Sequence, residues 1–447
     1  IVCIRWANAG LTFVASALFL LAAWLMLLPL RLGARIIALI PAVSLILLVN
    51  GSATHPLELQ QGAPAVRDIV VLGVVLVLLA WCRRQGGYAP AQAWHSAGLL
   101  AVAGTIAGLG WFWAYNRGTV ALIAVVAMAA AQLFLRRSPR GLVAAGAGIA
   151  LGLLIVAVSG IYGSVDANLD NLAYWSRHRD LYAVEWDLLV WLPVVPGLLL
   201  LAATFAVALV QAWVGLRQAR TEDALLIGLL SLVTLMYAAQ TVARPDRPHL
   251  AWALWPTMLL IVALLSVVLR PPVTTSRTVI AFTIAVAVMV ANSYGHGGPG
   301  NIATAMARSL AAPWHLANTI SAEDEELVEP GLRDAAAAIR AEAPACTMAM
   351  SNEGLLYLLA ATPPCSRFAF PVHIGRDHQQ EVIGELRREA PPTLLFDSPF
   401  WGSRIDGLAL ADRTPELAVW ILEAYPHETV LAQGYRLRHR RRPMERP

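Results

Sequence analysis

Long runs of apolar residues without any charged side chain recur through the first two thirds of this sequence. A helix needs roughly 20 apolar residues to cross the ~30 Å hydrocarbon core of a bilayer, where its backbone must also satisfy its own hydrogen bonds. Each such run therefore predicts a transmembrane helix. The ten crossings that we count are Gly10–Leu30, Ile36–Leu57, Ile69–Cys82, Gln85–Asn116, Gly118–Leu135, Gly141–Val165, Leu188–Leu216, Ala224–Ala243, Leu250–Leu269 and Thr278–Ala307. For the shortest run, Ile69–Cys82, a re-entrant or interfacial segment is the alternative.

The composition fits a membrane protein and excludes several other classes. Hydrophobic residues make up 58% of the 447 residues and charged residues only 14%, whereas soluble domains carry about one quarter charged residues. A chain this apolar is neither intrinsically disordered nor a small disulfide-rich scaffold. All 33 basic residues are arginine, and the scarcity of charge also excludes a nucleic-acid-binding protein of the usual kind.

Charge divides the chain into two parts. Residues 1–292 contain 18 arginines and 10 acidic residues, and residues 293–447 contain 15 arginines and 19 acidic residues. A basic, apolar part followed by a mildly acidic part predicts a membrane domain joined to a soluble one. We therefore predict a transmembrane domain at 1–292, a linker at 293–330 and a soluble α/β domain at 331–447. Because the sequence begins with Ile1 and not with Met, we expect its natural N-terminus to lie upstream.

The arginines between the crossings indicate which side of the membrane each loop faces. If the crossings alternate, one side receives Arg31, Arg35, Arg83, Arg84, Arg136, Arg137, Arg140, Arg217, Arg220, Arg270 and Arg277. The other side receives Arg67, Arg117, Arg177, Arg179, Arg244 and Arg247. Cytoplasmic loops carry the excess of positive charge, so the larger set is predicted to be cytoplasmic. The loops at 51–68, 116–118, 161–187 and 244–249, and everything after about Ser293, then face outward.

After residue 330 the sequence alternates between helical and strand patterns, which is typical of a small α/β domain. The predicted helices are Leu332–Glu342, Glu353–Leu359, His378–Glu389 and Pro415–Tyr425. The predicted strands are Cys346–Met350, Arg367–Pro371 and Thr393–Phe396, with a closing hairpin formed by Thr429–Leu431 and Tyr435–Leu437.

Two of the four cysteines, Cys346 and Cys365, fall in this soluble domain. One begins a predicted strand and the other comes just before the next strand, and adjacent strand ends can bring Cα atoms within the ~4.4–6.8 Å that a disulfide requires. An oxidising outer compartment would let the bond persist. We favour a disulfide, which would support the outward placement of the domain, over two buried thiols.

The segment Arg244–His249, with the sequence Arg-Pro-Asp-Arg-Pro-His, is the strongest candidate site. Ionisable residues at a membrane boundary are costly unless they are paired or solvated, and the two prolines stiffen the loop. Arg244 and Arg247 are candidates for binding a lipid phosphate, since guanidinium pairs with phosphate bidentately. Asp246 is a candidate catalytic residue or metal ligand, and His249 a candidate proton shuttle. The alternative is a well-paired interfacial turn.

Two further outer loops contribute candidates. The loop at 161–187 interleaves carboxylates with Tyr and Trp, and this combination suits carbohydrate because acids accept hydrogen bonds from hydroxyls while rings stack on sugars. Asp166 and Asp170 are its catalytic candidates, although a membrane-interface belt explains the aromatic residues better. Arg117, after the turn at Asn116, is predicted either to contact a lipid phosphate or to end a helix.

These residues give the chain a resemblance to the GT-C class of polytopic glycosyltransferases, and more narrowly to bacterial members with a small C-terminal periplasmic α/β domain. The resemblance rests first on Arg244-x-Asp246-x-x-His249-Leu250 and on Ser351-Asn-Glu-Gly-Leu-Leu-Tyr357-Leu-Leu. The later motifs that fit are Pro363-Pro364-x-x-Arg367-Phe368, Gln380-Glu-x-Ile383, Pro391-Pro392-Thr-Leu-Leu395 and Ile405-Asp406-Gly407.

The resemblance implies an inverting transferase that moves a sugar from a polyprenyl-phosphate carrier to a glycan, lipid or protein acceptor, on the outer face of a bacterial cytoplasmic membrane. Arg244 or Arg247 would hold the leaving phosphate, with Mg²⁺ or Mn²⁺ on Asp246. The class places its catalytic Asp in the first outer loop, which has no counterpart here because Arg5-Trp6 resembles the start of the second crossing. The general base is therefore not assigned to any residue of this sequence, and we expect an N-terminally truncated chain.

Other functions remain as alternatives. A transporter or flippase of a lipid-linked glycan would carry polar residues and broken helices at mid-membrane depth. The predicted crossings are nearly free of ionisable residues, although four prolines lie in them. An outer-face glycan ligase or polymerase would use similar Arg and His chemistry, and a non-catalytic assembly partner is the remaining case. The prolines are Pro41, Pro193, Pro196 and Pro256.

Overall fold

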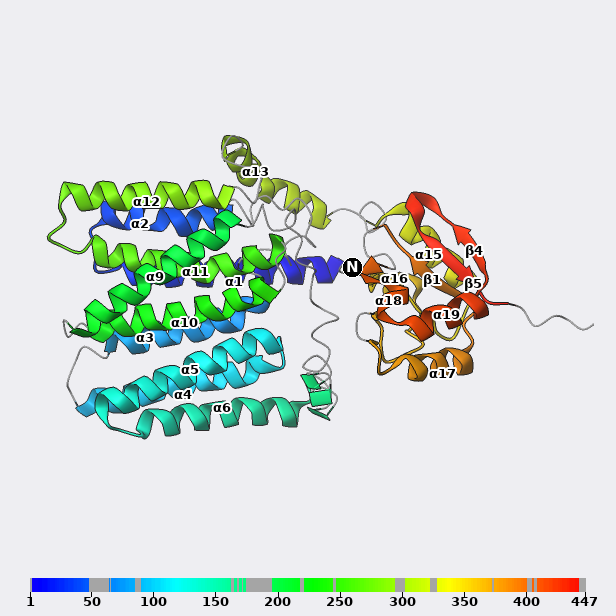
Figure 1. Cartoon of the computed structure of the whole chain (residues 1–447), viewed down its shortest axis with the longest axis horizontal. Helices are drawn as coiled ribbons and strands as arrows, with labels where there is room; N and C mark the ends of the chain where they lie inside the picture. The colour runs from blue at the N-terminus through cyan, green and yellow to red at the C-terminus, as the bar shows by residue number, and fades with distance from the viewer. Residues whose placement is uncertain are drawn as a thin grey trace, which may run out of the picture. The chain divides into compact units, whose positions relative to one another are not determined.

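Helices dominate the computed structural model, and a small sheet with its own helices lies near the C-terminus (Figure 1). The described residues form two compact units, a helical unit that extends to Ser321 and a C-terminal unit that begins at Val328. The residues that the structure describes are 2–47, 64, 66–84, 90–161, 165–166, 169–170, 172–173, 195–217, 221–243, 247–293, 302–321, 328–371, 374–399, 404–405 and 408–441.

Long apolar helices build the helical unit. Those described are α1 (Val2–Leu27), α2 (Leu32–Leu45), α3 (Ile69–Arg83), α4 (Pro90–Trp111), α5 (Tyr115–Arg136), α6 (Arg140–Ser159), α9 (Val195–Arg217), α10 (Thr221–Ala243), α11 (Arg247–Val268), α12 (Thr275–Ser293) and α13 (Ile302–Ser321). Each predicted crossing overlaps one of the helices α1 to α6 or α9 to α12, so the helical interpretation of the apolar runs is confirmed. Pro41 and Pro256 lie inside α2 and α11, as membrane helices tolerate.

One predicted boundary differs from the structure. The run Thr278–Ala307 does not form a single helix, because α12 ends at Ser293 and α13 begins separately at Ile302. The sequence between them, Tyr-Gly-His-Gly-Gly-Pro-Gly-Asn, is rich in glycine. Glycine costs about 1 kcal/mol relative to alanine in a helix interior, and proline costs more, so an apolar run that crosses such a segment does not continue as a helix.

Several helices have the length and composition of membrane spans. Large apolar side chains face outward from them: Phe134 is 82% exposed and Val158 is 80% exposed. A soluble surface disfavours extended apolar patches of this kind, and several candidate membrane-spanning helices suggest a multi-pass membrane protein. Among the described residues, the four helices long and apolar enough to cross a bilayer are Trp6–Leu27, Tyr115–Arg136, Arg140–Ser159 and Thr221–Ala239. Shorter apolar helices are Leu32–Leu45, Leu199–Gly215, Ala253–Val268 and Thr275–Val290.

Helices α4 and α6 pack against each other through glycine. Gly104 and Gly108 stand one turn apart on α4, and Gly148 and Gly152 have the same spacing on α6. A Cβ added at Gly104 or Gly108 would lie 2.5 Å from a backbone oxygen of α6, and a Cβ added at either glycine of α6 would lie still closer to a backbone oxygen of α4. The absence of side chains therefore lets the two backbones meet, which is the small-residue packing typical of membrane helices.

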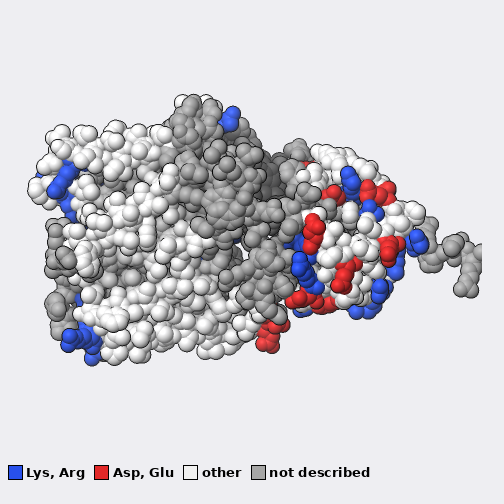
Figure 2. All heavy atoms as spheres, in the orientation of Figure 1, with Lys and Arg blue, Asp and Glu red and all other residues white. Residues whose placement is uncertain are grey.

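Basic side chains of the helical unit gather at one of its ends, and most of the described surface between its two ends is uncharged in Figure 2. The connections α1–α2, α5–α6 and α11–α12 lie at this end (Figure 1), and Arg31, Arg137 and Arg270 belong to them. Arg270 forms a bidentate ion pair with Asp223, with N–O distances of 2.6 and 2.5 Å. We call this the arginine-rich end.

The C-terminal unit contains an antiparallel sheet with strand order β1-β5-β4 and a second pair of short strands. The predicted closing hairpin is present as β4 and β5, with Thr429 opposite Leu437. The strands are β1 (Thr393–Asp397), β2 (Arg404–Ile405), β3 (Leu408–Ala409), β4 (His427–Val430) and β5 (Arg436–His439). The helices are α15 (Pro330–Ala341), α16 (Leu355–Ala360), α17 (Gln379–Glu389), α18 (Leu410–Arg413) and α19 (Pro415–Ala424).

Two extended segments continue the sheet beyond β1 in parallel orientation. Segment 346–350 pairs with β1, with Ala349 opposite Leu395, and segment 363–365 pairs with segment 346–350, with Thr347 opposite Pro364. The predicted strand at Arg367–Pro371 is wrong, since those residues form no strand and the pairing falls at Pro364 instead. Proline is accommodated there because an edge position does not require its missing N–H.

A disulfide joins these two extended segments. The Cα atoms of Cys346 and Cys365 are 4.9 Å apart, and the Cys365 N–H donates to the Thr347 carbonyl at 2.9 Å. Both cysteines belong to the buried core of the unit, together with Met348 and Leu386. Because disulfides persist in oxidising compartments, the bond is consistent with an extracytoplasmic location of the C-terminal unit.

Replacing Gly148 by Val will force α4 and α6 apart. We expect the free energy of unfolding to fall by about 1–3 kcal/mol, the usual range for overpacking. The measurement is the temperature at which purified protein in detergent loses its monodisperse elution peak. Gly146→Val is the matched control, because Gly146 is an exposed position of the same helix with nothing within 4 Å of an added Cβ. Equal melting temperatures for the two variants would contradict the glycine packing.

Candidate functional site

The predicted loop site at 244–249 is partly described. Arg244 and Asp246 lie outside the described residues, whereas Arg247 and His249 belong to the first turn of α11. Their roles in binding phosphate, in catalysis or in holding a metal therefore stay predictions. What the structure adds is the position of this connection, between the end of α10 and the start of α11.

The remaining predicted residues have very different environments. Asp166 and Asp170 have exposed side chains, so neither carboxylate is buried in the core of the helical unit. Arg117 lies in the first turn of α5 and is fully buried. Its Nε is 2.8 Å from Oδ1 of Asp68, and both side chains are 0% exposed. In this structure the guanidinium is neutralised inside the helical unit and is not presented to a lipid phosphate.

Tyr237 and Trp255 complete a buried cluster around this ion pair. The Tyr237 hydroxyl donates a hydrogen bond to Asp68 Oδ1 at 2.7 Å, and the Arg117 guanidinium carbon lies 4.2 Å from the centroid of the Tyr237 ring. The Trp255 ring meets the Tyr237 ring edge to face, with centroids 5.1 Å apart. We call these four residues, which are all fully buried, the Asp68 cluster.

The Asp68 cluster has the chemistry of a functional site rather than of an ordinary core. Burying two charges costs several kcal/mol per ion, and only close pairing with additional hydrogen bonds offsets that cost. Ionisable residues inside an apolar helical bundle are rare, and they mark functional sites by default. Asp68 stands at the end of the short helix η3 (Val66–Asp68), directly before α3.

The cluster lies at the same end of the helical unit as the predicted loop site. Tyr237 comes six residues before the end of α10 and Trp255 eight residues after the start of α11. At 1.5 Å per residue, Tyr237 is therefore about 9 Å along α10 from its last residue, and Trp255 about 12 Å along α11 from its first. This end is opposite to the arginine-rich end, because α3 and α5 start here and finish there.

Sequence reasoning missed Asp68, Tyr237 and Trp255. A signal for Asp68 existed: it is the single acidic residue between positions 59 and 165, and it directly precedes an apolar run. Such an isolated acid needs a cation nearby, and Arg117 begins a later run. Nothing local singles out Tyr237 or Trp255, because aromatic residues are common in membrane helices and at their ends.

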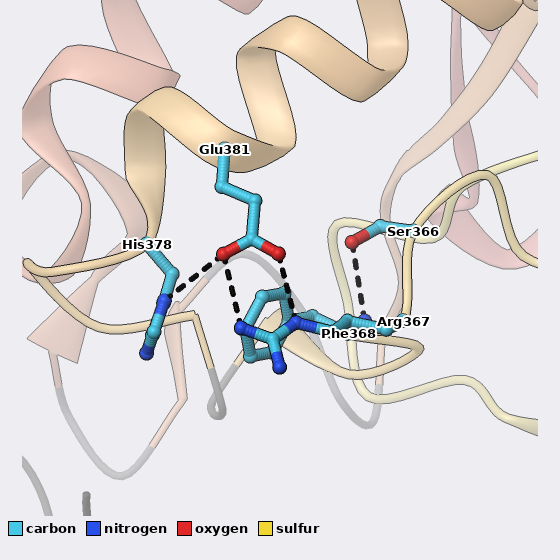
Figure 3. A network of polar contacts seen from close by, with 5 residues as sticks. All are labelled: Ser366, Arg367, Phe368, His378 and Glu381. Atoms are coloured by element: carbon cyan, nitrogen blue, oxygen red, sulfur yellow. Dashed lines mark hydrogen bonds and ion pairs between the residues drawn. The ribbon is translucent and has the colours of Figure 1, made fainter.

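A polar network on the C-terminal unit joins the segment after residue 365 to α17 (Figure 3). Nε and Nη2 of Arg367 donate to the two carboxylate oxygens of Glu381 at 2.8 and 3.0 Å. Nδ1 of His378 lies 3.2 Å from one of these oxygens, and the guanidinium covers the Phe368 ring at 4.6 Å. Hydrogen bonding from Arg367 holds the pKa of Glu381 below its usual value. The network is exposed and internally neutralised, so we interpret it as structural.

The fold is mostly helical, with candidate membrane spans that suggest a multi-pass membrane protein and a C-terminal unit that combines helices, a small sheet and a disulfide. Among the described residues, no three His, Cys, Asp or Glu side chains are grouped so as to hold a metal ion. Comparison with protein-family models, with curated proteins and with solved structures gives no match. No family is therefore identified.

Replacing Asp68 by Ala leaves the Arg117 guanidinium buried without its carboxylate, and we expect a loss of about 3–5 kcal/mol in stability. The double variant Asp68→Ala/Arg117→Met, which replaces the pair by apolar groups, should recover most of this loss. Unfolding by titration with sodium dodecyl sulfate, followed by tryptophan fluorescence, measures both values. A double variant less stable than Asp68→Ala would contradict the buried ion pair.

Replacing Glu381 by Gln will change the acid stability of the C-terminal unit. Because the folded pKa of Glu381 is depressed, its contribution is present above the unfolded value near 4.5 and is lost as pH falls below it. The pair is partly exposed, so we expect at most ~1 kcal/mol at neutral pH. Hydrogen exchange of the β1 amides between pH 3 and pH 7 reports this difference. Glu389→Gln, at an equally exposed carboxylate, is the control, and an identical acid profile for both variants would refute the assignment.

Proposed function

We propose that this chain belongs to an integral membrane glycosyltransferase that takes its sugar from a polyprenyl-phosphate carrier, on the outer face of a bacterial cytoplasmic membrane. In this proposal ten helices, α1 to α6 and α9 to α12, cross the bilayer. The arginine-rich end faces the cytoplasm, in keeping with the positive-inside rule. The C-terminal unit then lies outside, where its disulfide is stable.

The observation that carries the proposal is the Asp68 cluster at the outer end of the helical unit. A buried Arg–Asp–Tyr arrangement there joins the start of α3, the start of α5 and the last turns of α10, and α10 is the helix that precedes the 244–249 segment in the sequence. An active site at a membrane surface needs such support, because charged groups must be held in place where the surroundings cannot solvate them. The resemblance of the Arg244–His249 segment to GT-C transferases supplies the reaction.

The chemistry assigns separate tasks to the loop residues. Arg244 and Arg247 would bind the carrier phosphate and stabilise the charge that develops as it leaves the anomeric carbon. His249 would hold a phosphate oxygen or move a proton. Asp166 and Asp170, both exposed, would accept hydrogen bonds from sugar hydroxyls. The general base that deprotonates the acceptor hydroxyl is assigned to no residue of this sequence, and Asp246 is the candidate ligand for Mg²⁺ or Mn²⁺.

A flippase or transporter of a lipid-linked glycan is the second candidate, and the buried charges favour it specifically. Transport proteins place paired ionisable residues inside the helical bundle along the path of their substrate, and Arg117 and Asp68 are a buried pair of this chemical kind. An outer-face glycan ligase or polymerase shares the Arg and His chemistry of the loop, so phosphate binding alone does not separate it from a transferase.

The proposal predicts that the loop binds the carrier phosphate. Arg244→Ala and Arg247→Ala should each weaken binding of a fluorescent short-chain polyprenyl phosphate at least tenfold, since a charged hydrogen bond contributes about 1.5–3 kcal/mol. Fluorescence anisotropy with the full chain in nanodiscs measures the dissociation constant. Arg277→Ala is the control, because Arg277 is exposed in the first turn of α12 at the arginine-rich end.

Two further outcomes separate the alternatives. Equal affinity for the uncharged polyprenol, or unchanged binding by both loop variants, would remove the loop from the mechanism. Protein-dependent movement of the fluorescent lipid between leaflets, measured by dithionite quenching in liposomes, would favour the flippase. Release of polyprenyl phosphate from a radiolabelled polyprenyl-phosphate sugar, without such movement, would favour the transferase.

A further inference from the structure

Two parallel segments of the C-terminal unit end side by side. The N–H of Met350 donates to the Leu395 carbonyl at 2.7 Å, and the N–H of Leu395 donates to the Met348 carbonyl at 3.1 Å. This register places residues 351–353, which follow segment 346–350, beside residues 397–398 at the end of β1. A hydrogen bond from Ser398 to the Glu353 carboxylate joins the two ends directly.

The chain leaves these two ends in opposite directions. After segment 346–350 it passes through α16 to segment 363–365, which pairs on one side of segment 346–350. After β1 it passes through α19 to β4 and β5, and β5 pairs on the other side of β1. Where neighbouring parallel strands have connections that diverge in this way, a crevice forms at their carboxyl ends, and this is the usual ligand site of open α/β sheets.

Polar atoms without hydrogen-bond partners are buried at this edge. Ser351 is 0% exposed, and within the described part of the chain its Oγ has no partner. The adjacent Asn352 is half-buried, but its Oδ1 atom is itself buried and likewise has no partner within the described residues. A buried polar group left unpaired costs ~1–3 kcal/mol, so native proteins keep few of them without a reason. Two on consecutive residues, at the carboxyl end of a central parallel segment, point to a ligand that supplies the missing hydrogen bonds.

Carboxylates and hydroxyls complete the edge. Glu353 is 8% exposed, and burial raises the pKa of its carboxyl above the usual value. Asp397 accepts a hydrogen bond from the Ser398 N–H at 3.0 Å. The edge thus offers an acceptor at Asn352 and, at Ser351, a hydroxyl that both donates and accepts. The carboxyls of Glu353 and Asp397 and the Ser398 hydroxyl lie beside them.

We propose that Ser351, Asn352, Glu353, Asp397 and Ser398 form a binding site for a neutral polyhydroxylated ligand, of the chemical class of a glycosyl residue. Sugar hydroxyls both donate and accept hydrogen bonds, and so they match this mixture of acceptors and hydroxyls. An anionic ligand is disfavoured because two of these five side chains, Glu353 and Asp397, carry carboxyl groups. The site belongs to the C-terminal unit, and the proposal does not depend on the transferase reaction.

The test uses the full chain in nanodiscs, which avoids detergents that carry sugar headgroups. The probes are methyl α-glucopyranoside, methyl α-mannopyranoside, methyl α-galactopyranoside and methyl α-arabinofuranoside, each observed by saturation-transfer NMR. We expect transfer from the protein to at least one glycoside. Ser351→Ala and Asn352→Ala should weaken that binding at least tenfold.

The matched control is Ser366→Ala. Ser366 is also buried and also follows a parallel segment, but its Oγ already accepts a hydrogen bond from the Phe368 N–H at 3.1 Å. This variant should keep the glycoside affinity and lose protection in hydrogen exchange of the unit. Ser351→Ala should do the reverse, because it removes a hydroxyl that the folded protein leaves unpaired: exchange protection stays equal or rises while binding is lost.

Three results would overturn the proposal. The first is the absence of saturation transfer to all four glycosides from the unaltered chain. The second is glycoside binding by Ser351→Ala and Asn352→Ala with unchanged affinity. The third is calorimetric binding of Ca²⁺ that disappears in Glu353→Gln, which would make this edge a cation site instead.

Discussion

The ion pair between Arg117 and Asp68 is the interaction on which the helical unit depends most. A lone guanidinium or carboxylate inside an apolar bundle is far less favourable than the same group in water, so α5 gains its packed position only when η3 brings Asp68 to it. The Tyr237 hydroxyl and ring then contact both partners. Three helices distant in sequence therefore meet at one point, near the end of the unit where α10 finishes and α11 begins.

The two units handle charge by opposite means, as their surroundings require. In the helical unit most of the described charges stand near the ends of helices or are paired, as Arg270 is with Asp223, although Arg308 is exposed within α13. In the C-terminal unit, networks such as Arg367–Glu381–His378 remain in contact with water. The same contrast explains why composition alone divides the chain. Charged residues are disfavoured in segments that span a bilayer and are common in a domain that faces water.

Much of this architecture could be predicted from local sequence patterns. The main exceptions depend on contacts between residues that are distant in the sequence. Apolar run length predicts the long helices because a bilayer imposes a single length requirement, and local turn chemistry predicts the hairpin around Gln433 and Gly434. The strand expected at Arg367–Pro371 failed because the pairing partner, and not local β-propensity, decides which residues join a sheet. The contact between Tyr237 and Asp68 spans 169 positions, and no local pattern encodes such a contact. The loop at 244–249 was singled out by its charge, whereas the buried support beneath it was not.

The glycine contacts between α4 and α6 limit how this protein can change shape. Backbones that touch directly have no flexible side chains between them to absorb sliding or rotation, because any shift drives the main-chain atoms of one helix into those of the other. Helices α4 and α6 consequently behave as a single rigid body. Any rearrangement of the helical unit therefore has to take place among the other helices, with α4 and α6 as the fixed frame against which they move.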